Sequence, residues 1–386
     1  MAKEKEKIYN LLDYMDWRGD LLPSVVPYSD VDFVIFAELV YAPLENLKDY
    51  RGKAIKSLVT EIYPEALTDK DGFLRKTRYD LWSKVPNSPR FKDVKLEDFV
   101  SDFEVEQSKQ FAAALFTYGD EAVVAYRGTD STIIGWKEDF MLSFEVPVPA
   151  QTDAVEFLNR TIDSNKYKNI YLCGHSKGGN LAKYAGAMCK DQSVIAGIYD
   201  YDGPGLDEKT LKSQRWESIK GKIKGFIPES SVVGLLLGRG VENRIVRSES
   251  VSVMQHNPFH WHVLGSTFVT SEETTLSSRA IDTATHDFLD RLSNDRRRLL
   301  VETVFSLLEA SGARELRELP IHVAKNFAEV KKTYQNVSEE DWKALKEMAE
   351  ILKQSGSYGV KTVYDRDVAP EVEKKIGFLK NRKNRN

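Results

Sequence analysis

Short apolar runs alternate with longer amphipathic stretches through the middle of the chain, from about residue 110 to 265. The runs FAAALF (111–116) and AVVAYRG (122–128) flank Tyr118-Gly119-Asp120, which predicts a hairpin turn. The other elements predicted here are a helix near 150–163, a strand at 168–174, a helix near 177–190, and strands at 194–202, 222–228 and 243–248. Buried strands alternating with helices predict an α/β fold whose sheet is mostly parallel and covered on both faces.

The flanking regions have a helical pattern. In the segment 30–44, DVDFVIFAELVYAPL, the apolar side chains are expected on one helical face, and prolines break the region into short pieces. The five residues expected on that face are Phe33, Phe36, Ala37, Leu39 and Val40. Beyond about 275, the segment 286–310 has helical periodicity, and Ser338 to Asp341 is typical of a capping box. We therefore predict an N-terminal helical and irregular region (1–105) packed on the core, an α/β core (106–270) and a C-terminal helical extension (271–386).

Composition narrows the function classes. The chain has 386 residues, 41% hydrophobic and 30% charged, with a net charge of -4, which gives no general attraction to nucleic acid or anionic membrane. No 18-residue apolar stretch predicts a membrane span, and the charged start MAKEKEKIYNLLDYMDW does not resemble a signal peptide. Cys173 and Cys189 are expected to be buried thiols in a reducing cytoplasm. Neither CxxC nor HExxH occurs, so we expect no metal and no cofactor.

The segment YLCGHSKGGNLAKYAGAM (171–188) carries the candidate chemistry. Gly174-His175-Ser176-Lys177-Gly178 has the pattern G-x-S-x-G between an apolar run and a helical stretch. In a strand–turn–helix context, this pattern predicts a nucleophile elbow that exposes the serine at the edge of a sheet. The alternative is a structural serine that caps the helix. We predict that Ser176 is a nucleophile.

A serine nucleophile needs a histidine base, and the chain contains six histidines. His175 adjoins the serine and is expected to point elsewhere, and two others fall on predicted C-terminal helices. The segment VMQHNPFHWHVLG (253–265) remains, and its first histidine, His256, enters a turn after a predicted strand. We predict His256 as the base, with His260 as the alternative.

The orienting acid and the oxyanion hole are less sharply defined. Hydrolase order places the acid between the serine and the histidine, where Asp202 and Glu229 each follow a predicted strand. We favour Asp202, although a carboxylate that caps the Asp-Gly-Pro-Gly turn would also explain it. The oxyanion donors are expected to be the backbone N–H of Lys177 and Thr129 in VVAYRGTDS (123–131), through its backbone and its hydroxyl.

Several ordered motifs together resemble the lipase class 3-like α/β-hydrolases, and more closely their bacterial Mbeg1-like branch. The matching segments are PRF (89–91), QFAAALF (110–116), AYRGTDSTIIGWKEDF (125–140), GHSKGGNLAKYA (174–185), DGPG (202–205), IPESSVVGLLL (227–237) and QHNPFHW (255–261). The resemblance implies an α/β-hydrolase fold with helical additions at both ends. It also implies Ser176 as nucleophile, His256 as base and Thr129 in the oxyanion loop.

One departure from the class 3 pattern concerns the acid. Class 3 lipases place the triad aspartate in a motif like Asp-x-Val, where this chain has Ser231-Val232-Val233. Either the acid has moved to Asp202 or Glu229, or a hydroxyl or carbonyl orients the histidine.

These features favour a serine-dependent carboxyl-ester hydrolase of the lipase or esterase kind, acting through an acyl-enzyme on a small-molecule or lipid ester. Two alternatives remain: a weakly active or inactive hydrolase-fold protein used for binding or scaffolding, and an acyltransferase. The apolar segment 231–240 is expected to be a buried helix, or else a lid or acyl-binding wall.

Overall fold

A computed structural model describes residues 8–370 of the chain. It divides into two compact units. The first contains the described residues up to Glu272 together with Arg314–Glu318, and the second contains Glu273–Ala313 and the described residues from Leu319 onward.

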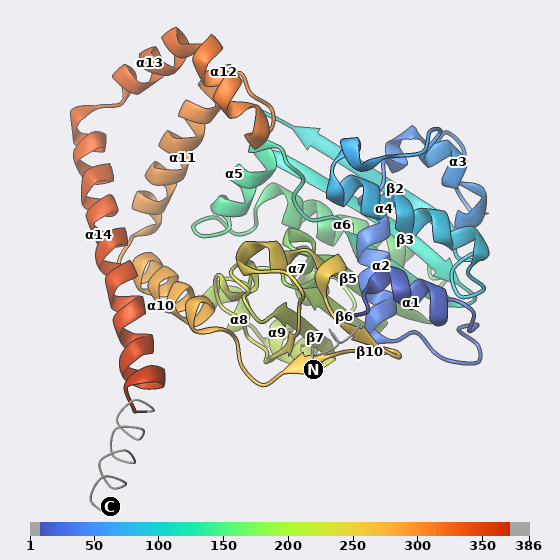
Figure 1. The fold of residues 1–386 in the computed structure, drawn as a ribbon. Helices are drawn as coiled ribbons and strands as arrows, with labels where there is room; N and C mark the ends of the chain where they lie inside the picture. Colours follow the sequence, from blue (N-terminus) through green and yellow to red (C-terminus); the bar gives the residue numbers. More distant parts are fainter. Residues whose placement is uncertain (1–7, 371–386) are drawn as a thin grey trace, which may run out of the picture. The chain divides into compact units, whose positions relative to one another are not determined.

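The described part of the first unit is built on one nine-stranded sheet with the order β1-β2-β3-β4-β5-β6-β7-β8-β11 (Figure 1). Strands β4 to β8 run parallel, whereas β1 to β4 and the β8–β11 pair are antiparallel. The strands of this sheet are β1 (Lys53–Ala54), β2 (Lys95–Glu104), β3 (Lys109–Tyr118), β4 (Glu121–Tyr126), β5 (Asn169–His175), β6 (Ile195–Tyr201), β7 (Ile223–Pro228), β8 (Asn243–Val246) and β11 (Thr270–Ser271). Strands β9 (Val263–Leu264) and β10 (Thr267–Phe268) pair in a separate two-stranded sheet.

The sheet is therefore mixed, and the prediction of a mostly parallel sheet was wrong at its edges. The hairpin between β3 and β4 turns at Gly119 with a φ of 58°, as its sequence predicts. Strand β2 extends this meander, although it lies in a stretch expected to be helical or irregular. Its alternating charged and apolar residues suit an antiparallel strand with one solvated face.

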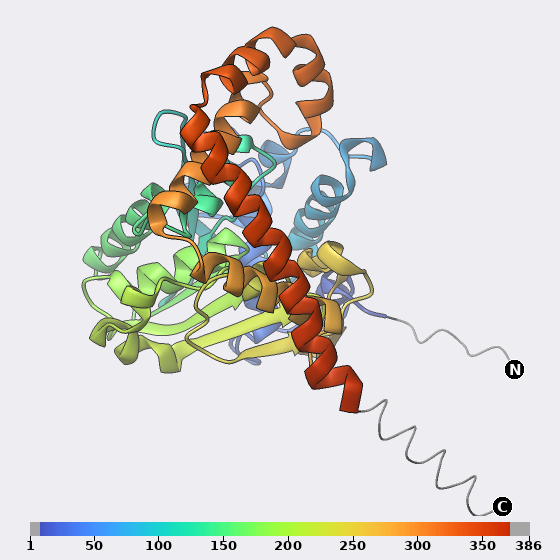
Figure 2. The ribbon, with the colours of Figure 1, turned by 90° about the vertical axis from the view of Figure 1, so that its left-hand side faces the viewer.

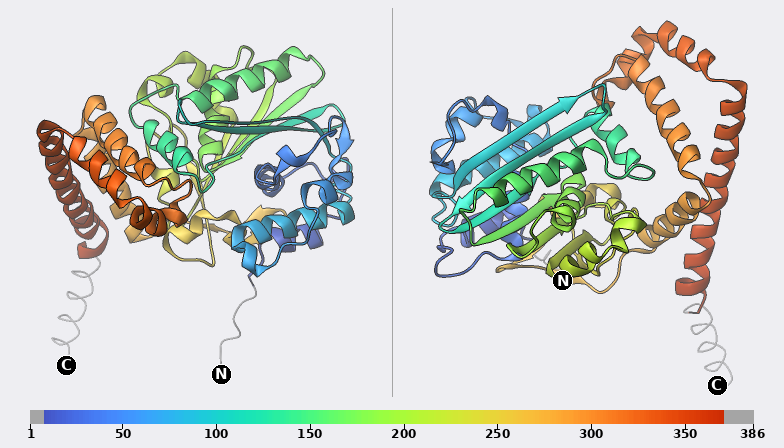
Figure 3. Two further views of the ribbon diagram at one scale, coloured as in Figure 1. Left: turned by 90° about the horizontal axis from the view of Figure 1, so that it is seen from above. Right: turned by 180° about the vertical axis from the view of Figure 1, so that it is seen from behind.

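Helices cover both faces of the sheet in the first unit (Figure 3). Apolar side chains of α6, α7 and α9 form one cluster with the sheet, and those of α1, α2 and α4 form another with its opposite face. The helices of this unit are α1 (Leu11–Trp17), α2 (Asp30–Leu39), α3 (Val59–Ile62), α4 (Phe73–Lys84), α5 (Ile133–Met141), α6 (Pro149–Asp163), α7 (Lys177–Met188), α8 (Glu208–Leu211) and α9 (Gln214–Ile219).

Helix α2 is buried on every side, not on one face. Every residue from Val31 to Leu39 is buried, including Asp32 and Glu38. An all-round apolar helix of this kind belongs inside a core, sandwiched between neighbouring elements. Its two carboxylates need partners there, because an unpaired buried charge is strongly destabilising.

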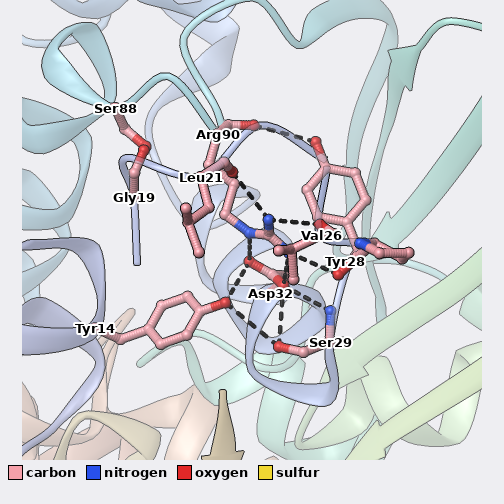
Figure 4. A network of polar contacts seen from close by, with 10 residues as sticks. Tyr14, Gly19, Leu21, Val26, Tyr28, Ser29, Asp32, Ser88 and Arg90 are labelled. Carbon is pink, nitrogen blue, oxygen red and sulfur yellow. Dashed lines mark hydrogen bonds and ion pairs between the residues drawn. The ribbon is translucent and has the colours of Figure 1, made fainter. Parts of the chain in front are cut away.

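Asp32 finds its partner in Arg90 of the PRF segment (Figure 4). The guanidinium donates to both carboxylate oxygens at 2.6 Å, and its remaining donors reach the carbonyls of Leu21, Val26 and Pro27. Tyr14 donates a further hydrogen bond to Asp32, at 2.8 Å. Because all five donors of the guanidinium are used, this network holds the N-terminal segments together and gives the PRF segment a structural role.

The second unit is helical in its described part. Helix α10 packs against the long helix α14 (Figure 2), and Gly359 allows the close approach, since a Cβ there would lie 2.4 Å from the carbonyl oxygen of Ala280. The predicted helical segment 286–310 is broken where Ser293 caps a new helix, and Ser338 caps α14 as expected. The helices of this unit are α10 (Leu276–Asp290), α11 (Asn294–Ala310), α12 (Leu319–Lys325), α13 (Phe327–Asn336) and α14 (Glu339–Val363).

The segment 231–240 is not the buried helix that its apolar run predicted. It contains a single 3-10 turn, Val233–Leu235, followed by an extended stretch that bridges Gly238 to Leu206. Within residues 8–370, no helix is both long and apolar enough to cross a membrane.

Candidate active site

Ser176 occupies a sharp turn between β5 and α7. Its φ is 59° and its ψ is -132°, a conformation that side-chain-bearing residues rarely adopt. The turn is held by hydrogen bonds from Ser176 N to Tyr201 O and from Gly179 N to Ser176 O, both 2.9 Å. A Cβ on Gly178 would lie 2.1 Å from the carbonyl oxygen of Tyr126, so the turn requires glycine there. The strand–turn–helix context predicted for G-x-S-x-G is therefore present, and Ser176 is only partly buried.

His256 lies at the end of a 3-10 turn, Ser252–His256, that follows β8. Its Nδ1 is 2.6 Å from Oδ2 of Asp202, whose side chain is fully buried, whereas the imidazole is 28% exposed. A carboxylate only accepts hydrogen bonds, so Nδ1 carries the proton and Nε2 of the neutral ring is left with its lone pair. This is the tautomer that a general base requires.

Asp202 follows β6 and is held by further donors. Ser231 donates its hydroxyl to Oδ1 at 2.5 Å, and the backbone N–H of Gly234 donates to the same oxygen at 3.1 Å. The carboxylate that caps the Asp-Gly-Pro-Gly turn is instead Asp200, which accepts from Gly203 N at 2.9 Å. Asp202 therefore uses one oxygen on His256 and the other on the segment after β7.

Glu229, the alternative acid, makes no hydrogen bond or ion pair with His256 within residues 8–370. Ser231 stands at the position of the class 3 aspartate and reaches Asp202 rather than the histidine. His260, the alternative base, lies with Nδ1 3.2 Å from the carbonyl oxygen of Met254, and its ring is 5.2 Å from that of Phe73.

The loop after β4 comes close to the nucleophile. A Cβ on Gly128 would lie 3.0 Å from the Cβ of Ser176, and Gly128 N donates to the Tyr41 hydroxyl at 3.0 Å. Thr129 donates its hydroxyl to Asp139 Oδ2 at 2.6 Å, so this hydroxyl is already engaged. Of the two donors expected from Thr129, the hydroxyl is therefore occupied, and no hydrogen bond from its backbone N–H to another described residue is found.

Asp139 is a titratable group beside this loop. Burial raises the pKa of its carboxyl to about 6, and the positive charge of Lys177 and the hydrogen bond from Thr129 offset only part of that effect.

The ammonium group of Lys177 points into the core, so only its backbone faces the Ser176 turn. Nζ donates to the carbonyl and side-chain oxygens of Gln110 and to Glu138, at 2.8 to 3.0 Å. Its own N–H is the first of helix α7, where helical geometry supplies no acceptor. That N–H, next to Ser176, also lies at the positive end of the helix dipole.

His175 does not point away from the site, contrary to the prediction. Its ring lies 4.6 Å from the ring of His256, and its Nε2 is 2.8 Å from the His256 carbonyl oxygen. On its other side Nδ1 is 3.1 Å from Glu38.

No hydrogen bond joins the Ser176 hydroxyl to His256 among the described residues. Such bonds are often long without substrate and tighten when it binds.

Sequence reasoning missed Glu38, Tyr41 and Asp139 as neighbours of the site. One usable signal was Glu38 itself, a charged residue within the apolar run FVIFAELV, because fully buried carboxylates are nearly always paired. Asp139 in GWKEDF gave no such signal, since charged residues surround it in the sequence.

A family model described as Mbeg1-like matches residues 85–306, more than half of the chain. Among solved structures, the M37 lipase is similar at 14% sequence identity and a TM-score of 0.34, covering 54% of this chain and 70% of that chain. A mutant form of MDLA from Penicillium cyclopium is similar at 13% identity and a TM-score of 0.37, covering 58% and 82%. None of the curated proteins matches. Since the family match spans more than half of the chain and includes strands β2 to β11, the Ser176 turn and the His256 loop, the chain belongs to the Mbeg1-like family.

Proposed function

We propose that this protein is a serine-dependent carboxyl-ester hydrolase of the α/β-hydrolase fold, with Ser176 as nucleophile, His256 as base and Asp202 as orienting acid. The observation that carries the proposal is the 2.6 Å contact between His256 Nδ1 and Asp202, at the edge of the sheet where Ser176 occupies its strained turn. A histidine with Nδ1 committed to a buried carboxylate and Nε2 free for a proton has the geometry of a general base.

In the acylation step, His256 Nε2 takes the proton of the Ser176 hydroxyl while Oγ attacks the ester carbonyl carbon. The carbonyl oxygen becomes an oxyanion, and the imidazolium is stabilised by Asp202. Collapse of the tetrahedral intermediate breaks the bond to the alkoxy group, which leaves as an alcohol with the proton from His256. The acyl group stays on Ser176 as an ester.

In the deacylation step, water repeats the attack. His256 accepts a proton from the water while the water oxygen adds to the acyl carbon. It then returns that proton to Ser176 Oγ as the carboxylic acid product leaves. The reaction consumes one ester and one water and releases one alcohol and one carboxylic acid.

The oxyanion is assigned to the backbone N–H groups of Lys177 and Thr129. The first is a free helix-terminal donor, and the second follows Gly128, which packs against the nucleophile. Removing one oxyanion donor typically costs on the order of 10² to 10³ in turnover, so the fixed position of the Thr129 loop matters. Thr129 is anchored by its own hydroxyl on Asp139.

A fluorophosphonate probe, which phosphonylates activated serines, tests the proposal. We expect labelling of the wild-type protein, with the adduct mapped by mass spectrometry to the peptide containing Ser176. Ser176→Ala is expected to abolish labelling, and His256→Ala to slow it strongly. Absence of wild-type labelling, or equal labelling of Ser176→Ala, would contradict the proposal and favour a binding or scaffolding role.

A further inference from the structure

A chain of buried polar groups connects the N-terminal helices to the backbone of the candidate base. Arg78 Nε donates to Glu38 Oε2 at 2.9 Å, Glu38 Oε1 lies 3.1 Å from His175 Nδ1, and His175 Nε2 lies 2.8 Å from the carbonyl oxygen of His256. The Glu38 side chain is 0% exposed and that of His175 is 7% exposed. Both side chains are therefore shielded from water, and electrostatic interactions are stronger in such a buried environment than at the surface.

The partners of His175 lie at both nitrogens of its ring. A backbone carbonyl oxygen can only accept, so Nε2 donates to His256. Glu38 Oε1 lies 3.1 Å from Nδ1, an ion-pair distance without hydrogen-bond geometry. Glu38 and the His256 carbonyl oxygen therefore contact opposite edges of the ring.

The Glu38 carboxyl stays ionised although it is fully buried. Burial alone would raise its pKa, but the charge of Arg78 and the contact with His175 outweigh burial and hold the pKa below its usual value. Arg78 also stacks over the Tyr41 ring, with its guanidinium carbon 3.7 Å from the ring centroid. The Tyr41 hydroxyl in turn donates to His175 O at 3.3 Å.

His256 is consequently held at two separate points. Asp202 fixes its ring through Nδ1, and His175 fixes its backbone through the carbonyl oxygen. With only the first contact, the ring could still shift together with its loop. The second contact ties the loop to the residue next to Ser176, and so couples the position of the base to that of the nucleophile.

We propose that His175, oriented by Glu38, is a positioning residue that sets the distance between His256 Nε2 and the Ser176 hydroxyl. This inference rests on the proposed function for its kinetic meaning, whereas the structural contact can be tested without any activity. A displacement of about 1 Å at a reacting pair can cost on the order of 100-fold in rate.

The His256 loop has other anchors, so variants at His175 are expected to remain folded. Trp261 Nε1 donates to Gln255 O at 2.7 Å, and Ser230 N donates to Gln255 Oε1 at 2.7 Å. These bonds hold the neighbouring residue of the loop without involving His175. His175→Phe keeps an aromatic ring but removes the donor, and His175→Gln restores a donor near the position of Nε2.

A second comparison separates positioning from general stability. Glu38 and Asp32 lie on the same helix, are both fully buried and are both paired with an arginine, but only Glu38 leads to His256. Glu38→Gln is expected to lower kcat about 10-fold, because a neutral amide holds the His175 ring less firmly. Asp32→Asn is expected to lower the melting temperature but keep kcat. If Asp32→Asn does not fold, Tyr14→Phe, which removes one donor to Asp32, replaces it.

The experiment combines ester hydrolysis kinetics with proton NMR of the His256 Nδ1–H that Asp202 shares. His175→Phe is expected to lower kcat about 100-fold with KM little changed, and to broaden or shift that resonance, with recovery in His175→Gln. Wild-type kcat in His175→Phe would overturn the inference and leave the proposed function standing. If the wild type has no activity, the proposed function fails, and the NMR decides alone: an unchanged resonance in His175→Phe overturns the positioning role, and a changed one that His175→Gln recovers supports it.

Discussion

Replacing Asp202 by asparagine tests the assignment of the acid, because the surrounding donors dictate how the new amide must lie. Ser231 and Gly234 both donate to Oδ1, so the amide oxygen is expected at that position. The amide NH2 then faces His256 Nδ1, where the carboxylate oxygen Oδ2 stood. A donor at that place forces Nδ1 to accept, which puts the ring proton on Nε2 and removes the base.

The expected loss is large and specific. In a serine protease triad the same substitution lowers turnover about 10⁴-fold, because it leaves the histidine in the wrong tautomer. That factor corresponds to about 5.5 kcal/mol in activation free energy. Ser231→Ala, in contrast, removes one of two donors to Oδ1 and leaves the tautomer intact. A hydrogen bond to a charged carboxylate contributes about 1.5 to 3 kcal/mol, so we expect a decrease on the order of 10- to 100-fold, well short of that in Asp202→Asn.

The assay is hydrolysis of a p-nitrophenyl ester by both variants, with melting temperatures measured in parallel. The variants are compared at one pH near 8 and at a temperature well below the lower melting point. The reasoning is refuted if Asp202→Asn keeps turnover within about 10-fold of wild type while remaining folded. Equal losses in the two variants would instead indicate that the whole segment had shifted.

Three further predictions follow from single contacts. Arg90→Met leaves the buried carboxylate of Asp32 without its arginine partner. Thermal unfolding is therefore expected to show a free energy of unfolding lower by about 3 to 5 kcal/mol. The pKa of Asp139 is raised to about 6 in the folded protein, so its contribution to stability is fully present below about pH 4 and is lost as the pH rises through 6. As the pH rises from 4 to 8, the free energy of unfolding of Asp139→Asn is therefore expected to increase by up to about 3 kcal/mol relative to that of the wild type. A difference in melting temperature that does not change with pH would contradict this. Gly178→Ala places a Cβ 2.1 Å from the Tyr126 carbonyl oxygen, and fluorophosphonate labelling of any folded variant is expected to be lost.

Local patterns predicted the elements around the site because each is specified within a few residues. The Gly119 hairpin, the strand before Ser176 and the cap at Ser338 all depend on neighbours in the sequence. The antiparallel strand β2 was missed because its charged face gives it little of the apolar run that marks a buried strand. Helix α2 was read as amphipathic because periodicity alone does not distinguish one buried face from two.

The polar partners of the site could not be predicted, since they come from distant parts of the chain. Asp202 and Ser231 were each considered as a partner of the histidine, but their contact with each other depends on the register of β6 and β7. Glu38 meets His175 only because α2 packs beneath β5. His175 was expected to point elsewhere because it adjoins Ser176, but side-chain direction at the end of a strand depends on such packing.

The central claim is that Ser176 carries the acyl group of an ester substrate. Rapid mixing with a p-nitrophenyl ester measures it directly, through the burst of p-nitrophenol and the mass of the protein quenched during the burst. We predict a burst stoichiometric with enzyme and an acyl mass on the peptide containing Ser176, both absent in Ser176→Ala. Ester turnover with no acyl adduct, or an adduct that persists in Ser176→Ala, would contradict the account.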